Sequence, residues 1–377
     1  MTSNMDEKTE TLVFTRKDTN IAKGLFIIMM LIHHLFYDYE TFGNFQVSFF
    51  LLSPHQVVVL AQYFKLCIAG FSLLTFYGLT RKYMQTPRTC YTRQVIPITI
   101  KRYLTLVLSF LMVYILSVLT AIIMKEDLAS LYSNGEKSWL GYGIIDAFGM
   151  ADFFHTPTLN VTWWYMSFAI AIIFLFPLFY KLYDKCGAVL VAIAAILPGA
   201  LNMESTYYGM CTFSMVLGIF AARVDLFSRL RAFGRGNLWV KFWKAVWCAI
   251  LVAVSFQLLF YSVSASWYFG IAAISWTFIS FEFISPIRGI REVFAFIGKH
   301  SMNIFLTHTF LYYYYAKDFI YSFGNGILIV IVLLVCSLLI ALAIEGIKKI
   351  IHFQAIVEWA VRQIFRLYAP TCPTGWK

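Results

Sequence analysis

Long runs of apolar residues, separated by short polar segments, recur along nearly the whole of this 377-residue chain. A helix needs about 20 mostly apolar residues to cross a bilayer core about 30 Å thick. Ten runs approach or reach that length. They cover residues 21–37, 57–79, 103–124, 163–180, 188–201, 207–222, 245–261, 267–284, 294–315 and 327–347. The runs show no alternation of apolar and polar positions, so we predict membrane-spanning helices rather than barrel strands.

The composition of the chain agrees with this prediction. Hydrophobic residues make up 60% of the sequence and charged residues only 13%, whereas a soluble domain has about 25% charged and about 45–50% apolar residues. A soluble enzyme, a disordered chain and a fibre are therefore excluded. The predicted fold class is all-α: a polytopic membrane protein with ten transmembrane helices.

The distribution of positive charge predicts the orientation of these helices. If the N-terminus is cytoplasmic and the spans alternate, nearly all of the 30 lysines and arginines fall in inner segments. The exceptions are Lys125, Lys137 and Lys317 in outer segments and Lys65 inside the second run. The positive-inside rule thus predicts ten spans with both termini cytoplasmic. It also explains the net charge of +11 without a nucleic-acid partner.

The sequence predicts three parts along the chain. Residues 1–20 are polar and lack the features of a cleaved signal, so we expect a cytoplasmic N-terminal segment. Residues 21–350 form the ten-helix membrane domain. In residues 351–377, apolar side chains such as Phe353 and Val357 share one helical face and polar ones the opposite face. This pattern predicts an amphipathic tail on the inner leaflet.

Several motifs of soluble enzymes do not occur. The sequence has no phosphate-binding G-x-x-x-x-G-K-[ST] loop, no H-E-x-x-H and no C-x-x-C. The seven cysteines are scattered, mostly in or beside the apolar runs. We therefore predict neither a disulfide framework nor a metal site.

A few ionisable residues lie inside the predicted spans, where they are costly and by default mark function. At 1.5 Å of rise per residue, His34, Lys65 and His308 fall in one layer at or above the midplane. Three groups in one layer favour a shared polar cavity that opens outward. Helix–helix polar contacts by the histidines, or an outward-reaching lysine, are the alternatives. His33 points about 100° away from His34, so only one of the two can face such a site.

Five segments, in order along the chain, form a recognisable set. They are Lys23-Gly24 with an apolar run and His34; Lys65–Gly78; Lys101-Arg102; Thr162–Pro177; and the segment from Gly298-Lys299 through Ser301-Met302 to His308. Over about residues 16–350 this set resembles the acyltransferase 3 family of integral membrane acyltransferases, which has ten spans. Three positions depart from the family pattern: Lys23 stands where many members have an arginine, Thr105 where many have a second arginine, and Phe76 where a glycine is usual.

The resemblance implies an O-acyltransferase of the bacterial inner (plasma) membrane. Its donor would be cytoplasmic acyl-CoA, most specifically acetyl-CoA, and its acceptor a sugar hydroxyl of a cell-surface or lipid-linked glycan. His34 matches the histidine of the family and would be the general base that takes the hydroxyl proton. Lys65 would stabilise developing negative charge or hold His34 neutral. His308 would position the reacting groups.

The resemblance also suggests where the substrates bind. Polyanionic CoA needs cations at the inner face, and the candidates are Lys23, Arg93, Lys101 and Arg102. A second set, which plain topological charge also explains, is Arg229, Arg231 and Arg235. Aromatic side chains at the outer face can stack on sugars, and the candidates are Trp163, Trp164 and Tyr165. An interfacial aromatic belt explains these three equally well.

A transporter of a sugar or lipid-linked sugar is the rival function, with the buried histidines and lysine as coupling groups. Composition and topology fit both functions. Only the set of motifs favours the enzyme.

Overall fold

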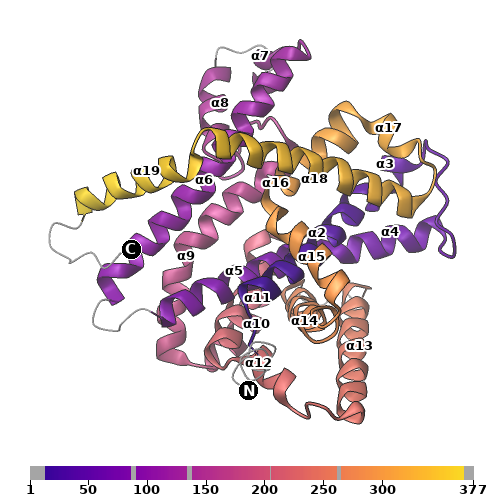
Figure 1. Ribbon diagram of the computed structural model, residues 1–377, viewed down its shortest axis with the longest axis vertical. Helices are drawn as coiled ribbons and strands as arrows, with labels where there is room; N and C mark the ends of the chain where they lie inside the picture. The colour runs from indigo at the N-terminus through magenta and orange to yellow at the C-terminus, as the bar shows by residue number, and fades with distance from the viewer. Residues whose placement is uncertain (1–12, 86–90, 134–137, 204, 261–264, 369–377) are drawn as a thin grey trace. The chain divides into compact units, whose positions relative to one another are not determined.

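The computed structural model describes residues 13–85, 91–133, 138–203, 205–260 and 265–368. Within these ranges every named secondary-structure element is a helix (Figure 1). The only β pairing in the described residues is an isolated bridge between Ser48 and Asn325. The chain divides into two compact units. One comprises Met1–Gln85 and Leu178–Leu338, and the other comprises Thr86–Pro177 and Leu339–Lys377. The all-α fold class is therefore confirmed.

The first unit holds most of the helices. They are α2 (Arg16–Phe36), α3 (Tyr39–Phe42), α4 (Pro54–Tyr63), the 3₁₀ turn η1 (Phe64–Leu66), α5 (Cys67–Met84), α10 (Val189–Ala200), α11 (Tyr207–Arg223), α12 (Leu226–Ala232), α13 (Leu238–Phe260), α14 (Ala265–Ile279), the π-helical turn η4 (Ser280–Ile284), α15 (Arg288–Lys299), α16 (Ser301–Thr309), the π-helical turn η5 (Phe310–Tyr315) and α17 (Lys317–Tyr321).

The second unit holds α6 (Tyr91–Ile123), α7 (Leu128–Ser133), α8 (Trp139–Ala147), the 3₁₀ turn η3 (Val161–Trp163) and α19 (Phe353–Tyr368). Two long helices begin in one unit and end in the other. These are α9 (Trp164–Cys186) and α18 (Gly326–Ile350).

In the described part of the chain, seven helical segments are long and apolar enough to cross a membrane. They are Arg16–Phe36, Pro54–Met84, Ile98–Ile123, Val161–Cys186, Leu238–Leu259, Ser266–Ile284 and Gly326–Ile350. Each overlaps one of the ten predicted runs, so the chain is a multi-pass membrane protein.

The other three predicted runs are not single long helices. Residues 188–201 form the 12-residue helix α10, and residues 207–222 form α11, which is bent by 60° against α12. Residues 294–315 are divided among α15, α16 and η5, with a break at His300. The count of ten spans therefore stays a prediction.

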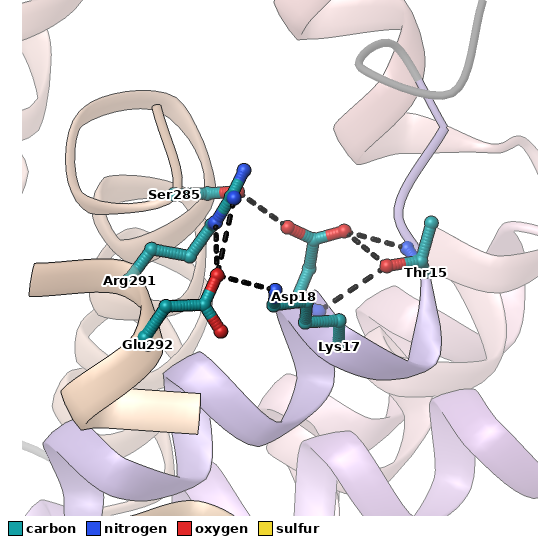
Figure 2. Close-up of polar contacts among 6 residues, drawn as sticks. All are labelled: Thr15, Lys17, Asp18, Ser285, Arg291 and Glu292. Carbon is teal, nitrogen blue, oxygen red and sulfur yellow. Dashed lines mark hydrogen bonds and ion pairs between the residues drawn. The ribbon is translucent and has the colours of Figure 1, made fainter. Parts of the chain in front are cut away.

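The start of α2 is defined by a capping box (Figure 2). The Thr15 hydroxyl accepts from the backbone N–H of Asp18, while the Asp18 carboxylate accepts from the backbone N–H of Thr15. The other carboxylate oxygen of Asp18 accepts from the Ser285 hydroxyl at 2.6 Å, just before α15. An ion pair of 2.6 Å between Lys17 and Glu292 adds a second link. The first turn of α2 is thus held against α15.

Two glycines allow α2 and α15 to pack backbone against backbone. A Cβ atom at Gly24 would fall on the carbonyl oxygen of Phe294, and one at Gly298 would fall on the carbonyl oxygen of Asn20. Small residues at such crossings let membrane helices approach closely. Both glycines belong to the motif segments, so their presence there has a direct packing reason.

Candidate functional site

His34 of α2 and His308 of α16 lie side by side. Their ring centroids are 5.0 Å apart, with 46° between the ring planes. Tyr312 stacks on His308 at 5.7 Å and lies 6.2 Å from His34. His308 is fully buried, Tyr312 is nearly so, and His34 is partly exposed. Two residues from opposite ends of the sequence thus form one cluster, which we call the histidine pair.

The contact between Gly24 and Gly298, which we call the glycine crossing, lies the same number of residues before the histidine pair on both helices. His34 follows Gly24 by ten residues, and His308 follows Gly298 by ten residues. The glycines pack together and the histidines pack together, so α2 runs parallel to the α15–α16 segment. About 15 Å of helix separates the two contacts. The crossing therefore sets which ring His34 meets.

The two rings differ in their hydrogen bonds. The Nδ1 atom of His308 lies 2.7 Å from the carbonyl oxygen of Phe305, which can only accept, so Nδ1 bears the hydrogen and Nε2 is left as acceptor. The Thr309 hydroxyl approaches Nε2 at 3.5 Å. His34 makes no hydrogen bond to any described residue. The two rings therefore differ in that His308 is held by the Phe305 carbonyl and His34 by packing alone.

His33 points elsewhere. Its Nδ1 lies 2.8 Å from the carbonyl oxygen of Ala61 in α4 and donates to it. This is the helix–helix polar contact that was one alternative for the histidines. The 100° step between adjacent residues explains why His33 faces α4 while His34 faces α16.

Lys65 lies on η1, the short 3₁₀ turn that interrupts the predicted second span. Its ammonium lies 5.8 Å from the centre of the Tyr207 ring, at the start of α11. Among the described residues it makes no hydrogen bond or ring contact with His34 or His308. Lys65 follows Ala61, the partner of His33, by about one turn. The structure therefore brings together His34 and His308 but does not add Lys65 to the histidine pair.

Three aromatic rings surround the predicted site. The rings of His34, His308 and Tyr312 pack against one another, and His308 has no exposed surface. The described part of the chain thus shows a packed aromatic cluster at this level of the helices. The outward-opening cavity shared with Lys65 stays a prediction.

The cations proposed to bind CoA lie in different units. Lys23 is partly buried in α2 of the first unit, next to the glycine crossing. Lys101 and Arg102 lie in α6 of the second unit, and Arg102 is exposed. Arg93 lies in the first turn of α6, and its side chain is outside the described part. In the alternative set, Arg231 stacks on Phe281 at 4.2 Å.

The three aromatic candidates for sugar binding differ in exposure. Trp163 is only 2% exposed and packs edge-on against Phe110 at 4.9 Å, so it is a core residue of the second unit. Trp164 and Tyr165 are partly exposed and meet edge to face at 5.8 Å. Only these two offer ring surface to a ligand.

Sequence reasoning missed a buried carboxylate in the second unit. Asp146 of α8 is 1% exposed and accepts three hydrogen bonds. The donors are the Tyr132 hydroxyl at 2.8 Å, the Thr158 hydroxyl at 2.9 Å and the backbone N–H of Leu159 at 2.8 Å. The Tyr132 hydroxyl also meets that of Tyr114 in α6 at 2.9 Å. Asp146 therefore ties α6, α7 and α8 to the segment before α9.

The burial of Asp146 predicts how the stability of the fold depends on pH. Burial raises the pKa of its carboxyl, against the opposing effect of the hydrogen bonds from Leu159, Tyr132 and Thr158. The folded state then binds a proton more tightly than the unfolded state, whose carboxyl pKa is about 4. This contribution to stability is present at low pH and is lost as the pH rises through the raised pKa.

Asp146→Asn removes this titration and an acceptor oxygen. We expect a loss of about 1–3 kcal/mol in the free energy of unfolding. Thermal unfolding across a pH series should show the difference between wild type and variant growing as the pH falls. A constant difference would contradict the assignment.

Among the described residues, no group of three or more His, Cys, Asp or Glu side chains could hold a metal ion. The fold and the site together define a multi-pass membrane protein with a histidine pair between two of its helices. One family model matches most of the chain. The model of the acyltransferase 3 family, described as an acyltransferase domain, covers residues 16–346.

The chain therefore belongs to the acyltransferase 3 family and is a membrane acyltransferase. A search of curated proteins found no match, and a search of solved structures found none either. The matched range includes Gly24, His34, Gly298 and His308. It ends within α18, so α19 lies beyond it.

Proposed function

We propose that this protein is an O-acyltransferase, most specifically an O-acetyltransferase, of the bacterial plasma membrane. It would move an acyl group from cytoplasmic acyl-CoA to a sugar hydroxyl of a cell-surface or lipid-linked glycan. The observation that supports this proposal most is the histidine pair, in which His34 makes no hydrogen bond to a described residue while His308 is held by the Phe305 carbonyl. Membership of an acyltransferase family disfavours the rival function of a transporter.

The proposed reaction moves one proton through His34, forms one carbon–oxygen bond and breaks one carbon–sulfur bond. A neutral His34 takes the proton of the sugar hydroxyl as its oxygen attacks the thioester carbonyl. The tetrahedral intermediate then collapses, the carbon–sulfur bond breaks and CoA leaves as a thiolate. His34 returns the proton to that sulfur. His308 and Tyr312 pack against the His34 ring and restrict its orientation.

The remaining candidates have supporting roles in this proposal. Lys65 would stabilise the negative charge that develops on the carbonyl oxygen. Trp164 and Tyr165 would stack on the sugar, because their rings are partly exposed. Lys23, Arg93, Lys101 and Arg102 would bind the CoA phosphates at the inner face.

We also propose ten spans with both termini cytoplasmic, residues 21–350 as the membrane domain and residues 351–377 as an inner-leaflet tail. The distribution of the basic residues supports this topology. A cysteine introduced at Gly234 should react with an impermeant thiol reagent only from the inner side. Reaction from outside would contradict the arrangement.

Acyl transfer by the purified protein tests the function directly. The reconstituted protein is given acetyl-CoA with a labelled acetyl group and candidate glycans, and both the glycan ester and free CoA are measured. Equal amounts of ester and CoA would support the proposal. Glycan uptake into vesicles without ester formation would support the transporter instead.

Arg102 provides a test of donor binding. Arg102→Ala should raise the KM for acetyl-CoA about 10- to 150-fold, since a charge-assisted phosphate contact contributes about 1.5–3 kcal/mol. The turnover number should change little. The control is Lys125→Gln, two residues beyond the C-terminal end of α6, which should leave the KM as it is. An unchanged KM in Arg102→Ala would mean that the donor binds elsewhere.

A further inference from the structure

The corner between α18 and α19 forms an open surface cavity. The chain turns there at His352, whose backbone has a φ of 49°, and α19 then leads away from the end of α18 (Figure 1). The cavity has a volume of about 510 Å³, and its polar lining is Glu345, Lys348, Lys349, His352, Gln354 and Glu358. Most of these residues lie beyond the part of the chain that matches the family.

Two opposite charges in this cavity are left without an ion-pair partner. Lys348 is paired with Glu345 at 2.9 Å and also lies over the ring of Phe353. Lys349 and Glu358, in contrast, are both exposed, and neither forms an ion pair with any residue in the described ranges. Gln354 donates to the Glu358 carboxylate at 3.3 Å and holds it in place. The cavity thus presents a cation and an anion that do not neutralise each other.

The surroundings of the cavity are apolar and exposed. Ile350 is 79% exposed, Trp359 is 60% exposed, and Ile351 and Ile356 are more than two-fifths exposed. Ile350 is also the last residue of a segment that is long and apolar enough to span a membrane. A charged cavity at the end of a membrane span, bordered by exposed apolar side chains, fits a ligand with a polar head and acyl chains.

We propose that this corner binds the headgroup of a zwitterionic aminophospholipid, such as phosphatidylethanolamine. Lys349 and His352 would meet the lipid phosphate, and the Glu358 carboxylate would accept from the primary ammonium. A purely anionic headgroup fits less well, because Glu358 would repel it. A quaternary ammonium also fits less well, because it has no N–H to donate. This site is independent of the proposed acyl transfer.

Lipid binding to the full-length protein tests the proposal. The protein in detergent is titrated with phosphatidylethanolamine, phosphatidylcholine or phosphatidylglycerol, and bound lipid is measured by native mass spectrometry. The wild type should prefer phosphatidylethanolamine to phosphatidylcholine. Lys349→Gln and Glu358→Gln should each weaken that binding about two- to fivefold, the range for an exposed charge pair. Thermal unfolding should be unchanged, since both side chains are exposed.

For phosphatidylglycerol, the two substitutions should change the affinity in opposite directions. Lys349→Gln should weaken its binding, whereas Glu358→Gln should strengthen it by removing a repulsion. The matched control is Arg362→Gln, on the same polar face of α19 but outside the cavity. It should change no affinity by more than the measurement error.

Three results would overturn the proposal. The first is a wild type without preference for phosphatidylethanolamine over phosphatidylcholine. The second is unchanged phosphatidylethanolamine binding in Glu358→Gln. The third is equal affinity for soluble glycerophosphoethanolamine, because the acyl chains would then contribute nothing and the ligand would not be a membrane lipid.

Discussion

His34→Ala is expected to lower the turnover number for acyl transfer by about 10²–10⁴-fold. The loss should appear in turnover rather than in donor binding, because proton removal matters only in the transition state. His34 is free of hydrogen bonds to described residues, so its removal should cost little folding stability. The measurement is ester formation at saturating acetyl-CoA, with CoA binding determined separately.

His33→Ala is the matched control, because it deletes the same side chain from the adjacent position. It removes the hydrogen bond to the Ala61 carbonyl, which should cost about 1 kcal/mol of stability. Turnover should fall far less than in His34→Ala. Equal losses of turnover in the two variants would favour a structural role for both His33 and His34 over a catalytic base. Near-normal turnover in His34→Ala would exclude it as the base and direct attention to His308.

The two histidines also show what sequence spacing can predict. Rise per residue placed His34 and His308 in one layer, and the structure finds their rings in contact. The choice of partner could not be predicted in that way, because it depends on which helices are neighbours. The crossing at Gly24 and Gly298 decides it, and such a crossing follows from tertiary packing.

Lys65 shows what the same arithmetic does not include. Its predicted depth and direction assumed a straight α-helix through residues 57–79. The 3₁₀ turn Phe64–Leu66 changes both the rise and the rotation at that point. The Lys65 side chain consequently meets Tyr207 of α11. In the same way, hydropathy averaged over residues 294–315 could not reveal the break at His300 between α15 and α16.

Burial that depends on tertiary contacts was the hardest property to predict. Asp146 stands between the predicted runs 103–124 and 163–180, where the sequence predicts no membrane span. Its burial depends on Tyr132 and Thr158, which come from separate segments of that connection. Trp163 similarly looked like an interfacial ring, yet its contact with Phe110 of α6 makes it a core residue. Neither contact has a local signal in the sequence.

Gly298→Ala is expected to destabilise the protein by about 2–4 kcal/mol, the upper part of the range for overpacking. The new Cβ atom would fall on the backbone of α2 at Asn20, and a backbone cannot move aside as a flexible side chain can. If α2 shifts to relieve this overlap, His34 moves relative to His308. Turnover should therefore fall as well, even at temperatures where the variant is folded.

Gly289→Ala is the control within the same helix. A Cβ atom there meets nothing within 4 Å, and alanine favours the helix by up to about 1 kcal/mol. Its thermal midpoint and turnover should equal or exceed those of the wild type. Gly24→Ala should resemble Gly298→Ala, and the double variant should lose less than the sum of the two, because both act on one crossing. Wild-type stability and turnover in Gly298→Ala would show that the crossing does not position the histidine pair.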